Sequence, residues 1–151
     1  MAEFLPRNPD FLASISDSFA RQGLMHTLGA ELGDIRPGIV EIRLPFSPGL
    51  TQQHGFIHAG AVASIIDSAG GYAAFSLFEA GDGVLTVEFK LNLLSPAAGE
   101  VLIARGQVVR PGRTLTVTTG EVVAVKNGVE IPCAVMQQTI MRIVGRPEVV
   151  E

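Results

Sequence analysis

The stretch HAGAVASIIDSAGGYAAF, residues 58–75, decides the fold of this chain. It belongs to the longest unbroken helical pattern in the sequence, which predicts a helix over residues 59–79. Most of its side chains are small, although a glycine inside a helix costs about 1 kcal/mol relative to alanine. Such a composition is favourable where other backbone approaches the helix closely on several sides. The sequence therefore predicts one long helix that is buried by the rest of the domain.

The segments around this helix have the patterns of strands joined by tight turns. In residues 85–93, alternation predicts one face with Leu85, Val87, Phe89, Leu91 and Leu93, and a second face with Thr86, Glu88, Lys90 and Asn92. Further strands are expected at residues 30–36, 39–45, 100–110, 114–126 and 129–144, separated by turns such as Asn127-Gly128. An antiparallel meander beside one long apolar helix predicts an α+β domain in which the sheet wraps the helix.

The N-terminal residues predict a separate amphipathic helix. Phe11, Ile15 and Phe19 recur at i, i+4 and i+8 within residues 10–24, and Asp10 is a candidate N-cap. No repeat or linker divides the 151 residues. We therefore expect one domain over residues 1–151, with an N-terminal helical segment at 1–28 and the core at 30–144.

Composition limits the partners of the chain. Hydrophobic residues make up 47% and charged residues 17%, which implies that a second copy of the chain covers part of the surface. The net charge of −4 predicts no nucleic-acid partner, and no segment approaches the roughly 20 apolar residues that span a bilayer. The start of the sequence lacks signal-peptide features, and Cys133, the single cysteine, is expected to be a small core residue in a reducing compartment. These features predict a cytoplasmic protein with no membrane partner.

Two features of the predicted helix suggest chemistry. Asp67 lies among small and apolar residues, where an unpaired carboxylate is costly to desolvate, so it either faces solvent, caps a neighbouring element or is functional. The helix begins at His58-Ala59-Gly60, where N–H groups without intrahelical partners can stabilise an oxyanion. An ordinary helix start with a capping histidine is the alternative.

The spacing of these two features has a geometric consequence. Ala59 and Asp67 are eight residues apart, which corresponds to about 12 Å along a helix. They cannot both contact one carbonyl group within a single subunit. If they cooperate, the helix start of one subunit must meet Asp67 of another, and the site is shared across a dimer interface.

The segment QQHGFIHAGAVASIID, residues 52–67, resembles the Asn-x-x-Gly-x-x-His-Gly-Gly-x-x-x-x-x-x-Asp signature of the PaaI-like hotdog thioesterases. Residues 85–89, 94–97 and 109–114 are also similar to that family, so the resemblance covers roughly residues 33–142. Two positions depart from the signature: Ala59 replaces the first glycine of the pair, and Gln52 replaces the asparagine. The resemblance implies a hotdog fold, hydrolysis of acyl-CoA, and a homodimer that is often paired again into a homotetramer.

The resemblance also implies roles for individual residues. Asp67 would activate water or attack the thioester directly, and the Ala59 N–H would polarise the thioester carbonyl in the partner's half-site. His58 would hold the loop near the thioester, Thr86 would orient the attacking water, and Gln52 would offer its amide to substrate or water. The substrate would also contact Gly60, Tyr72, Lys90, Arg110 and Arg113.

Coenzyme A carries phosphates, for which Arg110 and Arg113 are the best candidates and Lys90 a weaker one, although arginines at a turn are equally expected to be solvated. Tyr72, Phe75 or Phe56 would line the acyl pocket, and His54 has no role beyond a candidate pocket wall. No metal or separate cofactor is expected, because a thiolate leaves readily and coenzyme A is part of the substrate.

Three other interpretations remain. A hotdog hydratase or dehydratase needs a differently placed histidine and acid, which these motifs do not match. A non-catalytic acyl-CoA-sensing module is expected to carry a DNA-binding segment, which this sequence does not contain. An inactive, degenerate hotdog would not be expected to keep Asp67.

Overall fold

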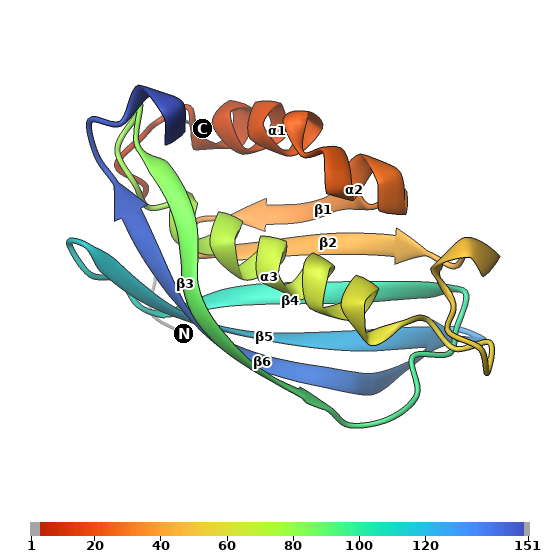
Figure 1. Cartoon of the computed structure of the whole chain (residues 1–151). Helices are drawn as coiled ribbons and strands as arrows, with labels where there is room; N and C mark the ends of the chain where they lie inside the picture. Colours follow the sequence, from red (N-terminus) through yellow and green to blue (C-terminus); the bar gives the residue numbers. More distant parts are fainter. Residues whose placement is uncertain (1–3, 150–151) are drawn as a thin grey trace.

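In the computed structural model, which describes residues 4–149, a curved antiparallel sheet wraps one central helix (Figure 1). The helix is α3 (Ala59–Phe75), and the sheet consists of β1 (Glu31–Arg36), β2 (Ile39–Pro45), β3 (Gly83–Leu93), β4 (Val101–Arg110), β5 (Leu115–Lys126) and β6 (Val129–Ile143). The strand order is β1-β2-β4-β5-β6-β3, so β1 and β3 form the two edges. This arrangement confirms the predicted α+β hotdog fold. The single domain over 1–151 stays a prediction, and residues 1–3 and 150–151 lie outside the described residues.

The N-terminal segment forms two helices, α1 (Phe11–Arg21) and α2 (Gly23–Leu28), where one helix over residues 10–24 was expected. The break occurs at Gln22, whose extended backbone (φ −74°, ψ 99°) ends α1 and begins α2. Asp10 occupies the N-cap position of α1 without a side-chain capping bond. Helix α2 ends at Gly29, whose positive φ of 74° closes the helix in the left-handed conformation. This change of direction brings Gln22 close to α3.

Small residues let α3 lie directly on the sheet. A Cβ atom at Gly106 of β4 would lie 2.3 Å from the carbonyl carbon of Ala69 and 2.4 Å from the Gly70 nitrogen, both on α3. Backbone atoms cannot move aside as a flexible side chain would, so this contact requires glycine. Ile65, Ile66 and Ala69 of α3 are fully buried there. The prediction of a buried helix is confirmed, although α3 ends at Phe75 and turns follow it.

A β-bulge at Val87 changes which residues of β3 face the helix. Thr86 pairs with Ile140 of β6, whereas Phe89, three residues later, pairs with Gln138. Paired residues in an antiparallel ladder share a face, and Ile140 and Gln138 are both buried against the helix side of the sheet. Thr86 and Phe89 therefore lie on the same face. The prediction that they lie on opposite faces is wrong, because the bulge adds one residue and shifts the alternation.

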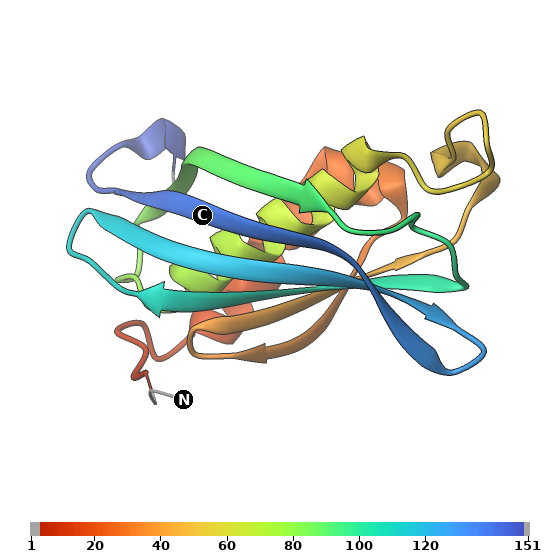
Figure 2. The same ribbon diagram turned by 90° about the horizontal axis from the view of Figure 1, so that it is seen from below.

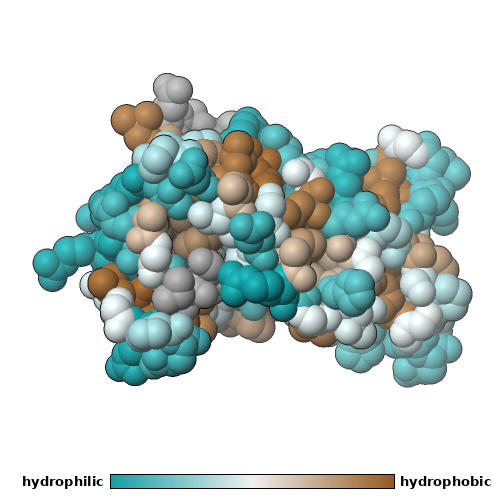
Figure 3. Space-filling model, turned by 90° about the horizontal axis from the view of Figure 1, so that it is seen from above, coloured by the Kyte–Doolittle hydropathy of each residue, from teal (hydrophilic) through white to brown (hydrophobic). Residues whose placement is uncertain are grey.

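Strand β3 combines a free edge with apolar side chains. Leu85, Val87, Phe89 and Leu93 are each about half exposed, between 48% and 54%. Within the described residues β3 pairs only with β6, so its other edge presents unpaired N–H and C=O groups. The face that carries α1 and α2 is different, because its apolar areas are separated by polar ones (Figure 3). Within residues 4–149, no helix has the length and apolar character that crossing a membrane requires.

The contact between Gly106 and α3 predicts a large effect of a small substitution. Gly106→Ala is expected to lower the free energy of unfolding by about 2 to 3 kcal/mol, because the new methyl group meets backbone. Gly23→Ala is the matched control, since a Cβ there meets nothing within 4 Å, and its effect should stay within about 1 kcal/mol. Urea denaturation of both variants measures this, and equal stability of the two would contradict the proposed packing constraint.

Candidate active site

Asp67 lies midway along α3, half-buried, with its carboxylate held by side chains from two strands. The Thr86 hydroxyl of β3 donates a hydrogen bond of 2.8 Å to Asp67 Oδ1. The Gln138 amide of β6 donates to the same oxygen at 2.7 Å. Within residues 4–149, no hydrogen bond or ion pair engages Asp67 Oδ2. One carboxylate oxygen is thus held in place, and the other is available.

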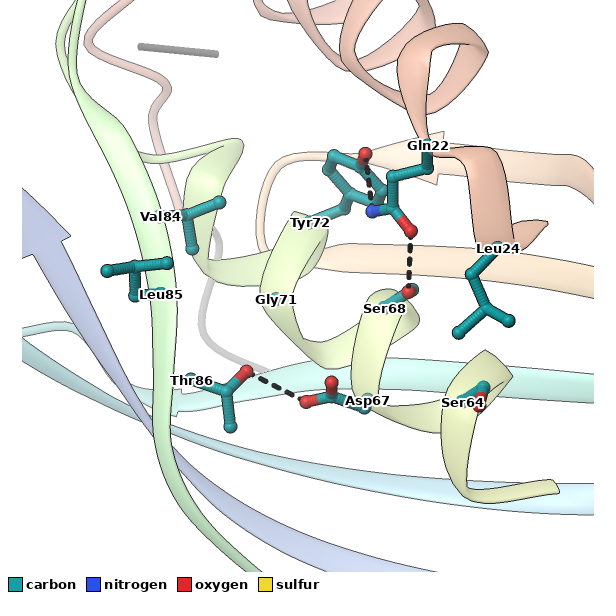
Figure 4. Close-up of a pocket in the computed structure, with 10 residues that line it drawn as sticks. All are labelled: Gln22, Leu24, Ser64, Asp67, Ser68, Gly71, Tyr72, Val84, Leu85 and Thr86. Carbon is teal, nitrogen blue, oxygen red and sulfur yellow. Dashed lines mark hydrogen bonds between the residues drawn. The ribbon is translucent and has the colours of Figure 1, made fainter. Parts of the chain in front are cut away.

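A cavity of about 310 Å³ opens beside this carboxylate, between α3, β3 and the start of α2 (Figure 4). Its walls are formed by Gln22, Leu24, Ser64, Asp67, Ser68, Gly71, Tyr72, Val84, Leu85 and Thr86. Figure 4 shows Asp67 and Thr86 pointing toward one another on one side, with Gln22, Ser68 and Tyr72 grouped on the other. We call this space the Asp67 cavity.

Tyr72 lies at the inner wall of the Asp67 cavity and is 2% exposed. Its hydroxyl accepts a hydrogen bond of 2.8 Å from the Gln22 amide and lies 3.0 Å from the Ser18 hydroxyl. The other end of the Gln22 amide accepts a bond of 3.3 Å from Ser68. The ring of Phe75 packs edge-on behind Tyr72, in the core. Of these two aromatic candidates, only Tyr72 lines the cavity.

The start of α3 has one free N–H group. His58 caps the helix: its Nδ1 accepts from Gly60 N at 2.8 Å, and its carbonyl accepts from Ala61 N at 3.0 Å and Val62 N at 3.3 Å. Because Nδ1 accepts, the ring proton of neutral His58 is on Nε2. Within residues 4–149, no hydrogen bond engages the N–H of Ala59. Ala59, and not Gly60, therefore carries the free donor at this helix end.

A second cavity, of about 400 Å³, lies at this helix start and is called the helix-start cavity. Its lining comes from the loop before α3, from α3 itself and from the segment after β3: Gln52, Phe56, Ile57, His58, Ala59, Val62, Leu93, Leu94, Ser95, Pro96, Ala97 and Cys133. Gln52 Oε1 accepts from the backbone N–H of His54, so this end of the side chain supports its own loop. His54 is exposed and does not belong to this lining.

The two cavities share no lining residue. Asp67 and Thr86 meet in the first, whereas Gln52, His58 and Ala59 meet in the second. One subunit therefore holds an acid and a free helix N–H in separate places, as the spacing along the helix requires.

The predicted phosphate-binding residues lie away from the helix start. Arg110 and Arg113 are exposed at the β4–β5 turn, at the end of the molecule opposite the start of α3 (Figures 1 and 2). Neither forms an ion pair with another described residue. Lys90 is exposed on β3 and donates to Asn92 Oδ1 at 2.7 Å. Within one subunit, the structure does not bring these cations together with either cavity.

Cys133 is 1% exposed, and burial raises the pKa of its thiol to about 11. A thiol is nucleophilic as its thiolate, so this residue is a core side chain at the wall of the helix-start cavity, as expected. Within residues 4–149, no three His, Cys, Asp or Glu side chains cluster as metal ligands would.

Gln138 is a site residue that the sequence analysis missed. It is 1% exposed, and it follows Ala134 and Met136 on the buried face of β6. One signal in the sequence was available: alternation along this strand predicts an apolar residue at position 138, and the residue there is glutamine. Its partner, Asp67, is 71 positions away in the chain, so no local pattern could have supplied the contact.

Comparisons with known proteins bear on the family and the fold of this chain. Residues 54–131 match the family model of the thioesterase superfamily. A curated relative from Halobacterium salinarum, named "Putative esterase", is 34% identical over 119 residues, or 76% of this chain and 78% of the relative. The crystal structure of a thioesterase family protein from Silicibacter pomeroyi is 52% identical, with a TM-score of 0.88 over 89% of this chain and 99% of that chain. The E. coli PaaI protein is similar in fold alone, at 21% identity and a TM-score of 0.80 over 92% and 97% of the two chains.

The cap at the start of α3 can be tested by substitution. His58→Ala removes the acceptor of the Gly60 N–H and is expected to lower the free energy of unfolding by about 1 kcal/mol. His58→Asn retains a capping oxygen and should recover most of this loss. His54→Ala, in the same loop, is the control and should change stability by less than about 0.5 kcal/mol. Chemical denaturation measures all three, and an equal loss at both histidines would exclude a specific cap.

Proposed function

Because the chain belongs to the thioesterase superfamily, we propose that it hydrolyses an acyl-CoA thioester to a free acid and coenzyme A. The observation that carries this proposal is the carboxylate of Asp67, with Oδ1 held by two donors and Oδ2 free at a cavity wall. Membership of the family supports thioester hydrolysis in general, and the acyl-CoA substrate is the specific part of the proposal.

In the proposed reaction, Asp67 Oδ2 takes a proton from water as the water oxygen bonds to the thioester carbonyl carbon. The tetrahedral intermediate then breaks its C–S bond, and coenzyme A leaves as a thiolate that accepts the proton from Asp67, which restores the carboxylate. Thr86 donates its own proton to Asp67, so the lone pairs of its hydroxyl oxygen are free to accept from the attacking water and orient it. Direct attack by Oδ2, through an anhydride that water hydrolyses, uses the same oxygen. Neither route needs a metal or cofactor, because the thiolate is a good leaving group.

The carbonyl oxygen needs a donor that the Asp67 cavity does not supply. We propose that the free Ala59 N–H of a second subunit stabilises the oxyanion, at the positive end of its helix. Gln52 and His58 line the same helix-start cavity and would contact the thioester region from that subunit. Gly60 gives its N–H to His58, so its contribution is space: a Cβ there would lie 3.1 Å from His58 Nδ1.

The proposed mechanism requires self-association, because the acid and the free helix N–H lie in separate cavities of one subunit. The apolar, unpaired edge of β3 is a surface that strand pairing with a second copy would cover. We propose a homodimer formed through this edge. Pairing of two dimers into a tetramer remains part of the proposal on the resemblance alone.

The two ends of the substrate have candidate contacts. The Asp67 cavity is at the lower end of the roughly 300–1,000 Å³ of small-molecule sites, which favours a compact acyl group against Tyr72. Arg110 and Arg113 are exposed and unpaired within the described residues, as phosphate ligands need to be, and Lys90 is a weaker candidate. Because these cations lie far from the helix start of their own subunit, they would serve a site that the partner completes.

A panel of acyl-CoA esters tests the proposed activity directly, with released thiol detected by a colorimetric thiol reagent. Hydrolysis of at least one ester is the expected result. An acyl-CoA-sensing module would bind the ester without releasing thiol, and a hydratase or dehydratase would change the acyl chain without releasing thiol. Either of these results would overturn the proposal.

Substitution of Asp67 tests the role of the carboxylate. Asp67→Asn keeps the shape and the acceptor for Thr86 and Gln138 but cannot take a proton, so kcat/KM should fall by about 10²- to 10⁴-fold. Asp17→Asn, at an exposed position of α1, is the matched control and should leave turnover unchanged. Circular dichroism confirms that both variants fold. Activity of Asp67→Asn within twofold of the parent would remove Asp67 from the mechanism.

Mixed subunits test the shared site. Ala59→Pro deletes the free N–H at a position where proline suits a helix, and the extended backbone of His58 (φ −62°, ψ 141°) accepts a following proline. Ala59→Pro and Asp67→Asn homodimers should each be inactive, because each has lost one half of both sites.

When the two variants are refolded together, half of the dimers are hybrids with one intact site, so about a quarter of the parent activity should return. Ala59→Pro refolded with the parent chain controls for refolding yield. A mixture that folds and dimerises but stays inactive would show that each subunit works alone.

A further inference from the structure

The strongest unassigned feature of the site is the buried amide of Gln138. Every hydrogen-bonding group of this side chain is engaged: Nε2 donates to Asp67 Oδ1 at 2.7 Å and to the Asp67 carbonyl at 3.2 Å, and Oε1 accepts from Thr118 Oγ1 at 3.1 Å. Thr118, on β5, is 0% exposed. The amide therefore links the acid on α3 to two neighbouring strands.

Its partners determine the orientation of this amide. A flipped amide would turn its oxygen toward the carboxylate and the carbonyl of Asp67, two acceptors that would repel it. The Thr118 hydroxyl can donate or accept, so the two acceptors of Asp67 decide the orientation. Only the observed orientation satisfies both ends, so the donor to Asp67 is fixed without any contribution from substrate.

Helix α3 has a glycine where this amide approaches it. A Cβ atom at Gly70 would lie 1.8 Å from Gln138 Oε1 and 2.9 Å from Thr118 Oγ1. The helix thus leaves room for a polar pair, although alanine would stabilise the helix by about 1 kcal/mol. Three elements, α3, β5 and β6, accommodate one glutamine next to the acid.

We propose that Gln138 is a positioning residue, which together with Thr86 engages Asp67 Oδ1 so that Oδ2 is the oxygen that reacts with water or substrate. This inference rests on the proposed thioester hydrolysis. Gln138 does not touch the reacting atoms: it fixes the rotation of the carboxylate and stabilises its charged form. Thr86 contacts the carboxylate and also lines the cavity. Gln138 bonds to the same carboxylate oxygen but does not line the cavity.

No other charged side chain lines the Asp67 cavity. Among its lining residues, Tyr72 is the one other titratable group, and its hydroxyl is bonded to Gln22 and Ser18. The groups that meet Asp67 from β3 and β6 are the neutral Thr86 and Gln138. A substitution at Gln138 therefore acts on the carboxylate itself, without a second charge in the cavity.

The test compares Gln138→Met and Gln138→Glu with the control Gln137→Met, using a hydrolysed acyl-CoA ester. Methionine keeps the length but not the donor, and kcat should fall about 10- to 100-fold while KM changes less than about threefold. Gln138→Glu places a second carboxylate against Asp67, so it should lose at least as much kcat as Gln138→Met. Gln137 points to the opposite, exposed face of β6, so Gln137→Met should behave as the parent.

Thr118→Val provides a second variant in case Gln138 substitutions do not fold. Valine matches threonine in shape but cannot hold Oε1, so kcat should fall by about three- to tenfold with KM nearly unchanged. A folded Gln138→Met or Thr118→Val with parental kcat would overturn the inference. A loss of kcat that follows thermal stability, with KM raised by a similar factor, would assign Gln138 a structural role only. If the parent itself hydrolyses no ester, the proposed function has failed, and a positioning role cannot stand without it.

Discussion

The close contact between helix α3 and strand β4 determines how everything else in this structure is placed. Gly106 brings the sheet within van der Waals distance of the backbone at Ala69 and Gly70. At this separation, side chains from the neighbouring strands β5 and β6 approach the helix backbone at Asp67 and Gly70. A helix with larger residues would stand further from the sheet, and Gln138, which Thr118 holds at its other end, would no longer reach Asp67. Packing and chemistry therefore depend on the same small residues.

The polar side chains that this close packing brings together form hydrogen bonds with one another. Asp67, Gln138, Thr118 and Thr86 form a connected set of hydrogen bonds, and no buried side-chain polar atom of the described residues lacks a partner. A partly satisfied network in this position would cost several kcal/mol per unpaired group. Within this network, Asp67 Oδ2 is the carboxylate oxygen that has no partner among the described residues, so it can form a new hydrogen bond.

Sequence patterns predicted the elements well, because each depends on neighbours along the chain. The helix start at Ala59 and the limits of β2 agree with the structure to the residue. The bulge at Val87 was not predictable, since alternation in the sequence continues through it while the backbone adds a residue. The apolar period ends at Phe19, so it did not indicate where the helix stops or that Gln22 begins a second one. The Gln138 contact depends on tertiary structure, which no local pattern encodes.

Two positions of α3, Ala59 and Asp67, differ in what the proposed mechanism requires of the sequence. At Ala59 the proposed donor is a backbone N–H, so alanine in place of the signature glycine changes clearance and leaves the donor in place. At Asp67 the proposed reacting group is a side chain, whose orientation depends on residues from two strands. The proposed mechanism therefore tolerates small side chains at the first position, provided that the backbone N–H is kept. At the second, even a conservative change must preserve a network that spans four elements.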